Sequence, residues 1–238
     1  MGIRVRLRLV RRRIWLRVAA AVMGLATIGG APHVAAAGQS ANDAVAFFRA
    51  AQLNDAARIK PLLARGLDPN VREPERGETG LIVALRHDAM NVFDLLLAQP
   101  KIQLDAQATN GNTALMMAAF RNNKAAVERL VARGAQVNRP GFTALHYAAA
   151  AGAIDILRYL IEQHAYIDAE SPTGVTPLML AAREGQEEAV KVLLEEGADA
   201  ALRDKGFHLT AAEMAEKADK PWIAEAIRKH LAARAARR

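Results

Sequence analysis

Residues Thr113–Ala119 read TALMMAA, and two later stretches repeat this pattern: Thr143–Ala149 reads TALHYAA and Thr176–Ala182 reads TPLMLAA. They start 30 and 33 residues apart, so the chain contains an internal repeat with a period near 33. Such a repeat specifies stacked units that share one continuous core, and the usual output of this scaffold is a surface that holds another macromolecule. The pattern therefore favours a binding protein over an enzyme.

Each unit is predicted to be a pair of short helices, which makes the fold class all-α. Thr176 can cap a helix with its side-chain oxygen, and Pro177 suits the first helical position. Apolar residues then recur at i, i+3 and i+4, which marks one helix face. The first-helix stripes are Leu115, Ala118, Ala119; Leu145, Ala148, Ala149; and Leu178, Ala181, Ala182. The second-helix stripes are Val127, Leu130, Val131; Leu157, Leu160, Ile161; and Val190, Leu193, Leu194.

The segments between the helices have turn composition. Gly134 and Gly197 follow second helices, where a left-handed residue ends the helix most easily as glycine. Polar turns that contain glycine, 109–112 and 171–174, lead to the next threonine. Because one unit cannot bury its own apolar face, neighbouring units are expected to stack.

Units that fit the pattern less well flank the three clear repeats. Residues 47–66 look like a first repeat without the threonine opening, and its Pro61 should bend a helix. A second repeat begins at Thr79 and continues to Leu97, and residues 205–231 read as a closing pair of helices. Terminal units are expected to be atypical because one of their faces meets water. The sequence thus predicts five repeats and a C-terminal cap.

With its repeated T-A-L and T-P-L heptads and shared second stripes, the chain resembles the ankyrin-repeat family over residues 43–231. The resemblance implies a curved, right-handed solenoid of stacked helix–turn–helix units with short β-hairpin or turn loops. It also implies binding through the hairpin tips and the inner helices, on the concave side. Two departures stand out. The loop from Asn138 to Gly141 is about three residues short, which should stunt one hairpin, and His164 stands where the family prefers glycine.

The N-terminus has the three parts of a secretory signal: arginines up to Arg17, an uncharged run of 15 residues from Val18 to Pro32, and the A-x-A site at 35–37. We expect a signal peptide at residues 1–37 with cleavage after Ala37, a linker at 38–42, and a periplasmic bacterial protein that uses the general secretory route. Contact with the membrane is expected only through this segment. Export by the twin-arginine route, suggested by Arg12-Arg13, and an uncleaved anchor are the less favoured alternatives.

The positive charge of the chain is concentrated in that segment. The formal charge is +7, from 32 basic and 25 acidic residues, but residues 1–37 contain seven arginines and no acid. The rest has 25 basic and 25 acidic residues, so no nucleic-acid partner is expected. A basic end remains around Arg228 and Lys229 and in the tail at 232–238, and its simplest reading is a solvated helix end. There are no cysteines, which leaves no disulfide or thiol chemistry.

The sequence contains no catalytic constellation that we can identify, so we expect no catalytic residue, no cofactor, no metal and no enzyme. Its histidines lack the spacing of a zinc site, and phosphate loops and the G-x-S-x-G motif are absent. His146 occupies the histidine of the family's T-P-L-H motif, which implies structural hydrogen bonds. The acidic pairs Glu187-Glu188 and Glu195-Glu196 are most simply a solvated face.

Partner-binding candidates follow from the resemblance, which places variable contacts beside the turn glycine and after the inner Ala-Ala pair. These positions are Arg86, His87, Asn110, Asn112, Phe120, Arg121, Phe142, Ala150, Ala151, Thr173, Val175, Arg183 and Glu184. Phe120, Phe142 and Arg121 stand out because aromatic and arginine side chains dominate interface energetics. Ala150-Ala151 should leave a flat patch between Phe120 and Arg183.

The function predicted is a monomeric periplasmic module that captures one protein partner on its concave face. It could support an envelope enzyme or neutralise a toxin or hydrolase, and the sequence does not separate these uses. Two alternatives remain. One is a non-catalytic, substrate-holding subunit of an envelope enzyme, and the other is binding of nucleic acid or another anionic surface by the basic C-terminal tail.

Overall fold

The computed structural model describes residues 33–236, which form twelve helices. All the repeats lie within residues 39–238, which form one compact unit. The helices are α1 (His33–Gln52), α2 (Ala56–Ala64), α3 (Gly80–Arg86), α4 (Met90–Leu97), α5 (Ala114–Phe120), α6 (Lys124–Ala132), α7 (Ala144–Ala151), α8 (Ile154–Glu162), α9 (Pro177–Glu184), α10 (Glu187–Glu195), α11 (Ala211–Lys217) and α12 (Pro221–Ala235). None of them is long and apolar enough to cross a membrane.

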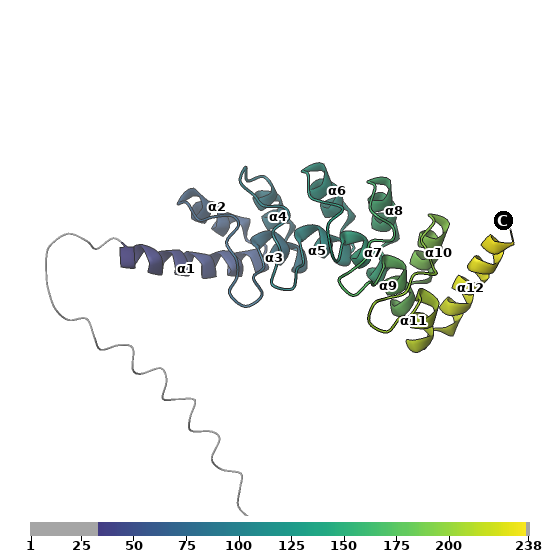
Figure 1. The fold of residues 1–238 in the computed structure, drawn as a ribbon. Helices are drawn as coiled ribbons and strands as arrows, with labels where there is room; N and C mark the ends of the chain where they lie inside the picture. The colour runs from purple at the N-terminus through teal and green to yellow at the C-terminus, as the bar shows by residue number, and fades with distance from the viewer. Residues whose placement is uncertain (1–32, 237–238) are drawn as a thin grey trace, which may run out of the picture. The chain divides into compact units, whose positions relative to one another are not determined.

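The helices of residues 39–238 pair and stack as the repeats predict (Figure 1). In each pair from α3/α4 to α11/α12, the first helix packs against the second. The first helices α3, α5, α7, α9 and α11 also form one layer by packing on each other in chain order. Contacts among second helices, such as α8 with α10 and α10 with α12, form the other layer. The predicted all-helical repeat solenoid is therefore confirmed, and α11/α12 add a further helix pair to the stack.

Threonine caps and small inner residues explain why the first helices form and pack closely. The Thr113 and Thr176 hydroxyls accept hydrogen bonds from the third backbone N–H of α5 and α9, at 3.4 Å each. The leucines of the heptads, such as Leu145 and Leu178, are buried, as are the alanine pairs that follow them. Alanine adds little volume, so neighbouring first helices can approach each other closely.

Most of the loops before the first helices close with a backbone hydrogen bond across their base. Donor and acceptor pairs are Glu73 N to Glu78 O at 2.9 Å, Ala108 N to Asn112 O at 2.8 Å, Ser171 N to Val175 O at 2.9 Å, and Asp204 N to Leu209 O at 3.1 Å. No equivalent backbone bond closes the described residues 138–142, which agrees with the stunted hairpin expected there. The hairpins are minimal: in the described chain, β-structure amounts to one isolated bridge between Arg72 and Thr79.

Four hydrogen bonds to Asn and Asp side chains join the segments that follow successive second helices, from α2 to α10. Each side-chain oxygen accepts a backbone N–H of the following repeat, which ties the loops together at regular intervals. The bonds run from Gln103 N to Asn70 (2.7 Å), from Gln136 N to Asp105 (2.9 Å), from Tyr166 N to Asn138 (2.8 Å) and from Asp199 N to Asp168 (3.0 Å).

Left-handed residues end several helices at the places the sequence indicated. Gly134 and Gly197 have φ values of +92° and +96°. His164, the non-glycine residue at the equivalent position, also adopts a left-handed conformation with φ of +61°. The predicted conformational exception is therefore confirmed.

Two boundary predictions differ from the structure. Residues 38–42, expected as a linker, lie inside α1, although Gly38, Ser40 and Asn42 are weak helix formers. Residues 232–235, expected as part of a tail, continue α12, since Ala and Arg are strong helix formers. The signal-peptide prediction lies outside the described residues as far as residue 32, and residues 33–37 are the start of α1.

Candidate functional site

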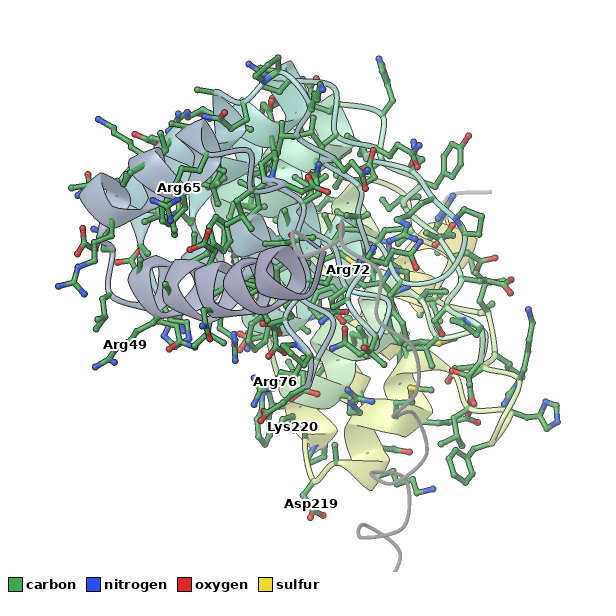
Figure 2. The ribbon with its side chains drawn as sticks, turned by 90° about the vertical axis from the view of Figure 1, so that its left-hand side faces the viewer. Arg49, Arg65, Arg72, Arg76, Asp219 and Lys220 are labelled. Carbon is green, nitrogen blue, oxygen red and sulfur yellow. The ribbon has the colours of Figure 1, made fainter. Side chains whose placement is uncertain are left out.

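The candidate binding residues lie on what we call the first-helix face. It consists of the C-terminal ends of α3, α5, α7, α9 and α11 and of the loops that precede these helices. Figure 2 looks along the stack from its N-terminal end, and there Arg76, in the loop before α3, lies well apart from Arg65 at the end of α2. The loops before the first helices and the ends of the second helices thus present separate surfaces to solvent.

An aromatic cluster occupies the middle of the first-helix face. Phe120 lies at the end of α5 and is 52% exposed, and Phe142 lies in the loop before α7 and is 39% exposed. Both rings contact Tyr147 of α7, with centroid separations of 6.1 Å and 6.2 Å. Phe142 also meets the buried His146 ring edge-on at 5.3 Å. The side chains of two predicted candidates are thus brought together around a tyrosine that the sequence reasoning did not single out.

Tyr147 is held in place by Asn112, another predicted contact residue. The Tyr147 hydroxyl donates to Asn112 Oδ1 at 2.5 Å, across the gap between the α5 and α7 repeats. Burial raises the pKa of the phenol. Asn112 therefore acts first as a support for the cluster, while Asn110 remains exposed at the loop tip.

Beneath the cluster, His146 makes the structural hydrogen bonds expected of it. Its Nδ1 lies 3.2 Å from the Thr143 backbone N–H, and its Nε2 lies 2.9 Å from the Val175 carbonyl oxygen. Since Nδ1 must accept and Nε2 must donate, these partners assign the neutral Nε2–H tautomer. Burial lowers the pKa of His146, which keeps the ring neutral. The ring thereby fixes the next loop relative to α7.

The N-terminal part of the face carries the next candidates. Arg86 is half-buried and pairs with the buried Glu78, with Nη2 and Oε2 2.7 Å apart. His87 beside it is exposed, and desolvation followed by the charge of Arg86 lowers its pKa. Arg121 is exposed at the end of α5, next to Phe120. Arg86 is thus committed to an internal ion pair, while Arg121 projects from the surface.

Ala150 and Ala151 are half-buried, as expected for a low patch. The patch is bounded on one side by Gln186, whose amide donates to the Ala150 carbonyl oxygen at 3.2 Å. The same glutamine lies against Gly152, where an added Cβ would come within 2.3 Å of its Oε1. The room beside the alanines is therefore smaller than the sequence alone suggested.

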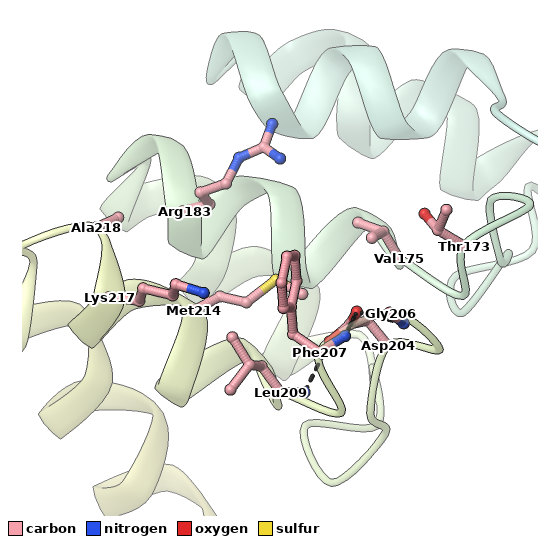
Figure 3. A pocket seen from close by; sticks show the side chains of 10 residues that line it. All are labelled: Thr173, Val175, Arg183, Asp204, Gly206, Phe207, Leu209, Met214, Lys217 and Ala218. Atoms are coloured by element: carbon pink, nitrogen blue, oxygen red, sulfur yellow. Dashed lines mark hydrogen bonds between the residues drawn. The ribbon is translucent and has the colours of Figure 1, made fainter.

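Four predicted candidates lie at the C-terminal end of the face, three of them in a pocket of about 450 Å³ (Figure 3). The pocket is lined by Thr173, Val175, Arg183, Asp204, Gly206, Phe207, Leu209, Met214, Lys217 and Ala218. Glu184 lies outside this lining and pairs with Arg183 at 2.9 Å. Phe207 is 72% exposed, and the Lys217 ammonium lies 4.1 Å from the centre of its ring.

Sequence reasoning missed Tyr147, Phe207 and Lys217. Tyr147 sits inside a heptad whose other members are scaffold, so the repeat concealed it. Lys217 occupies the same place in its unit as Phe120 and Arg183 in theirs, seven residues after the opening threonine. Extending the alignment of repeats into the closing unit would have found it.

Potential metal ligands are not grouped in the described part of the chain. In residues 33–236, no three His, Asp or Glu side chains are grouped so that they could hold a metal ion. At the basic C-terminal end, Arg228 forms an ion pair with Glu216 at 2.7 Å, which neutralises part of the positive charge of that segment. The arrangement supports contact with another molecule through aromatic and cationic side chains.

Comparison with protein families accounts for most of the repeats. The family model described as "Ankyrin repeats (3 copies)" matches residues 47–141 and 138–204. The chain belongs to the ankyrin-repeat family. Ankyrin repeats generally mediate protein–protein interaction, and the family is typically non-catalytic. Residues 205–231 lie beyond the match, and the structure shows that they add the helix pair α11/α12 to the ankyrin stack.

The similar curated proteins are long and diverse. Human transient receptor potential cation channel subfamily A member 1 is 31% identical over 160 residues, which is 63% of this chain and 14% of the channel. Neurogenic locus notch homolog protein 1 of Xenopus tropicalis is 37% identical over 139 residues, 57% of this chain and 6% of the relative. Human SH3 and multiple ankyrin repeat domains protein 2 is 33% identical over 146 residues, which is 60% of this chain and 8% of the relative.

This ankyrin chain thus spans only a small part of each relative. The similarity follows the repeats, whose Thr, Leu and Ala residues are scaffold. The residues that would define a partner, such as Phe120 and Phe207, lie at positions that the repeat pattern leaves free.

Proposed function

We propose that this ankyrin-repeat protein captures a protein partner on its first-helix face, after export to the periplasm. The observation that carries the proposal is the aromatic cluster of Phe120, Phe142 and Tyr147, which leaves two large rings in solvent at the centre of that face. Solvent-exposed aromatic side chains grouped on a rigid support are typical of the few residues that supply most of an interface's binding energy.

The surroundings of the cluster support this role. The Tyr147 hydroxyl is fixed by Asn112, and the loop beyond α7 is fixed by His146, so little side-chain entropy remains to be lost on binding. Arg121 adds an exposed guanidinium next to Phe120, and arginine is enriched at the centre of interfaces. The role in the cell would be support of an envelope enzyme or inhibition of a toxin or hydrolase.

The periplasmic location in this proposal is supported by the sequence of residues 1–37, with its arginines, uncharged run and A-x-A site. Expression of the full chain in a Gram-negative host, followed by fractionation and mass determination, tests it. Recovery in the periplasmic fraction with a new N-terminus at residue 38 supports the proposal. Recovery of the uncut chain in the cytoplasm contradicts it.

Crosslinking affinity capture from an envelope fraction tests partner binding. After the captured protein is identified, its affinity is measured for the natural chain and for Phe120→Ala and Arg121→Ala. Each change should weaken binding by more than about fivefold, equivalent to about 1 kcal/mol, because each removes an exposed anchor. Tyr166→Ala is the matched control, because Tyr166 is an exposed aromatic residue (69%) on the loop after α8.

Unchanged affinity in both variants, with unchanged melting temperatures, would contradict the proposal that the aromatic cluster anchors the partner. The identity of the captured protein also separates the main reading from its alternative. An envelope enzyme whose turnover depends on the ankyrin chain as a substrate-holding subunit would favour the alternative, whereas an enzyme or toxin that is merely stabilised or inhibited favours a capture module.

A further inference from the structure

The pocket at the C-terminal end of the first-helix face lies outside the aromatic cluster and has its own chemistry. It opens between α9 and α11, with a volume of about 450 Å³. Val175, Leu209 and Met214 give it an apolar wall, and all three are buried or half-buried. Figure 3 shows the Phe207 ring standing among these side chains, close to Lys217 and Met214.

Phe207 is exposed on a loop that is fixed rather than loose. The Asp204 carboxylate accepts backbone N–H groups from Gly206 and Phe207 at 2.8 Å and from Leu209 at 2.7 Å. The Lys205 N–H donates to the Thr173 carbonyl oxygen at 2.8 Å, which joins the loop to the preceding one. A large, mostly exposed aromatic ring is therefore held by a hydrogen-bonded loop.

Among the charged residues that line the pocket, two are cations, Arg183 and Lys217, and one is a carboxylate, Asp204. Lys217 rests on the Phe207 ring, and in the described part of the chain no carboxylate lies within ion-pair distance of its ammonium. Arg183 has one acidic partner, the adjacent and exposed Glu184. Asp204, the carboxylate of the lining, is 3% exposed and already accepts three hydrogen bonds from its own loop. The pocket thus joins an apolar wall to two cations whose charge is not fully met.

We propose that this pocket binds an extended acidic segment of the protein partner, in which an apolar side chain of leucine size precedes carboxylates. The apolar side chain would lie against Phe207 and Met214, and the carboxylates would reach Lys217 and Arg183. This inference rests on the proposed function, because it assigns part of the same first-helix face to one feature of the partner. Charge complementarity selects the acidic segment over a basic or neutral one.

The test uses the full chain labelled with ¹⁵N and three capped pentapeptides as probes. The first has a central leucine followed by two aspartates, the second replaces the aspartates by asparagines, and the third replaces the leucine by glycine. Titration of each peptide is followed through the amide signals of Val175, Gly206 and Leu209. The first peptide should give saturable shifts with a Kd of about 1 mM or tighter, and the other two should bind at least about fivefold more weakly.

Two variants of the chain sharpen the result. Lys217→Gln removes the charge and should weaken the first peptide at least about threefold, with little effect on the asparagine peptide. Lys191→Gln, an exposed lysine on the second helix α10, is the matched control and should change nothing. Phe207→Ala should weaken both peptides that contain leucine, because it removes the wall they share. Raising the salt concentration should weaken only the aspartate peptides.

Equal affinity for the leucine-aspartate and leucine-asparagine peptides would overturn the inference, as would no saturable shift, or an effect of Lys191→Gln as large as that of Lys217→Gln. These failures leave the proposed function separately testable. If the peptides fail while Phe120→Ala still weakens capture of the partner, the pocket assignment falls and the proposed function stands. If the peptides bind while Phe120→Ala and Arg121→Ala leave capture of the partner unchanged, the pocket assignment stands and the proposed role of the aromatic cluster falls.

Discussion

The ring of Phe47 in α1 lies directly against the main chain of Gly80 at the start of α3. A Cβ added to Gly80 would come within 2.6 Å of a ring carbon of Phe47 and within 2.8 Å of Leu96 Cδ1. The phenylalanine is fully buried, so it has little room to yield. At this place the other first helices begin with Ala114, Ala144, Pro177 and Ala211. The glycine therefore lets the divergent first repeat bring a large ring close to the second.

Gly80→Ala is expected to destabilise the protein by about 1–3 kcal/mol, because the new methyl group overpacks a rigid contact. The change is measured by urea unfolding of the purified chain. Phe47→Leu provides the control, since a smaller side chain should make the alanine tolerable and the two changes should be non-additive. Additive losses would show that Phe47 is not the residue that excludes the methyl group.

The burial of His146 predicts a pH dependence. Burial lowers the pKa of His146 in the folded chain below its usual 6.5. Below about pH 6.5 the unfolded chain binds a proton that the folded chain resists, so stability should fall as the pH falls through this range. His146→Met, which copies Met116 and Met179 of neighbouring repeats, should flatten this slope, measured as thermal melts between about pH 7.5 and 5.5.

The same variant should lose about 1–3 kcal/mol at neutral pH, because the Val175 carbonyl oxygen loses its donor. The pKa of His87 is also lowered, so a slope of the same sign should persist in His146→Met and diminish further when His87→Gln is added. A slope that is unchanged in His146→Met would assign the pH dependence to other groups.

His164→Gly should make the protein more stable. His164 holds φ of +61° after α8, where a residue with a Cβ is strained by about 1 kcal/mol and glycine is not. Its side chain is exposed, and the bond to Asn138 uses its backbone oxygen, so the substitution removes the strain without removing that bond. A rise in the midpoint of urea unfolding checks the expectation. Gly134→Ala, the mirror change at the equivalent position, should lower it.

Asp204→Ala should loosen the loop that presents Phe207. Three backbone N–H groups lose their acceptor, so the amides of Gly206, Phe207 and Leu209 should exchange with solvent faster by at least about tenfold. The same bonds, led by that of Phe207, lower the pKa of Asp204. Its stabilising contribution is therefore present above the usual value of 3.8 and is lost as the pH falls below it. Equal protection in the variant would mean that other contacts hold the loop.

Much of the fold could be predicted from residues whose role is local. Thr176 and Pro177 mark a helix start wherever they occur, and Gly197 marks an end, because caps and left-handed residues act within one turn. His164 was identified as an exception on the same ground. The structure continues α1 through residues 38–42 and α12 through residues 232–235, where the sequence predicted a linker and a tail.

The candidate site was only partly predictable. Phe120 and Phe142 were chosen from their places in the repeat, and the structure leaves both exposed. That these rings converge on Tyr147 depends on the spacing between α5 and α7, which no single repeat encodes. The ion pair of Arg86 was equally hard to predict from the sequence. Its partner Glu78 lies in the loop before α3, and the tertiary structure brings the two side chains together.

The sequence by itself determined that this protein is a stack of helix pairs, because a period near 33 repeats the same caps, stripes and turns, and each of these is satisfied by near neighbours in the chain. The tertiary structure alone decided which side chains remain for another molecule. Exposure of Phe207, the neutral ring of His146 and the contact of Phe47 with Gly80 all depend on how closely one repeat approaches the next, and that distance is set by packing across repeats.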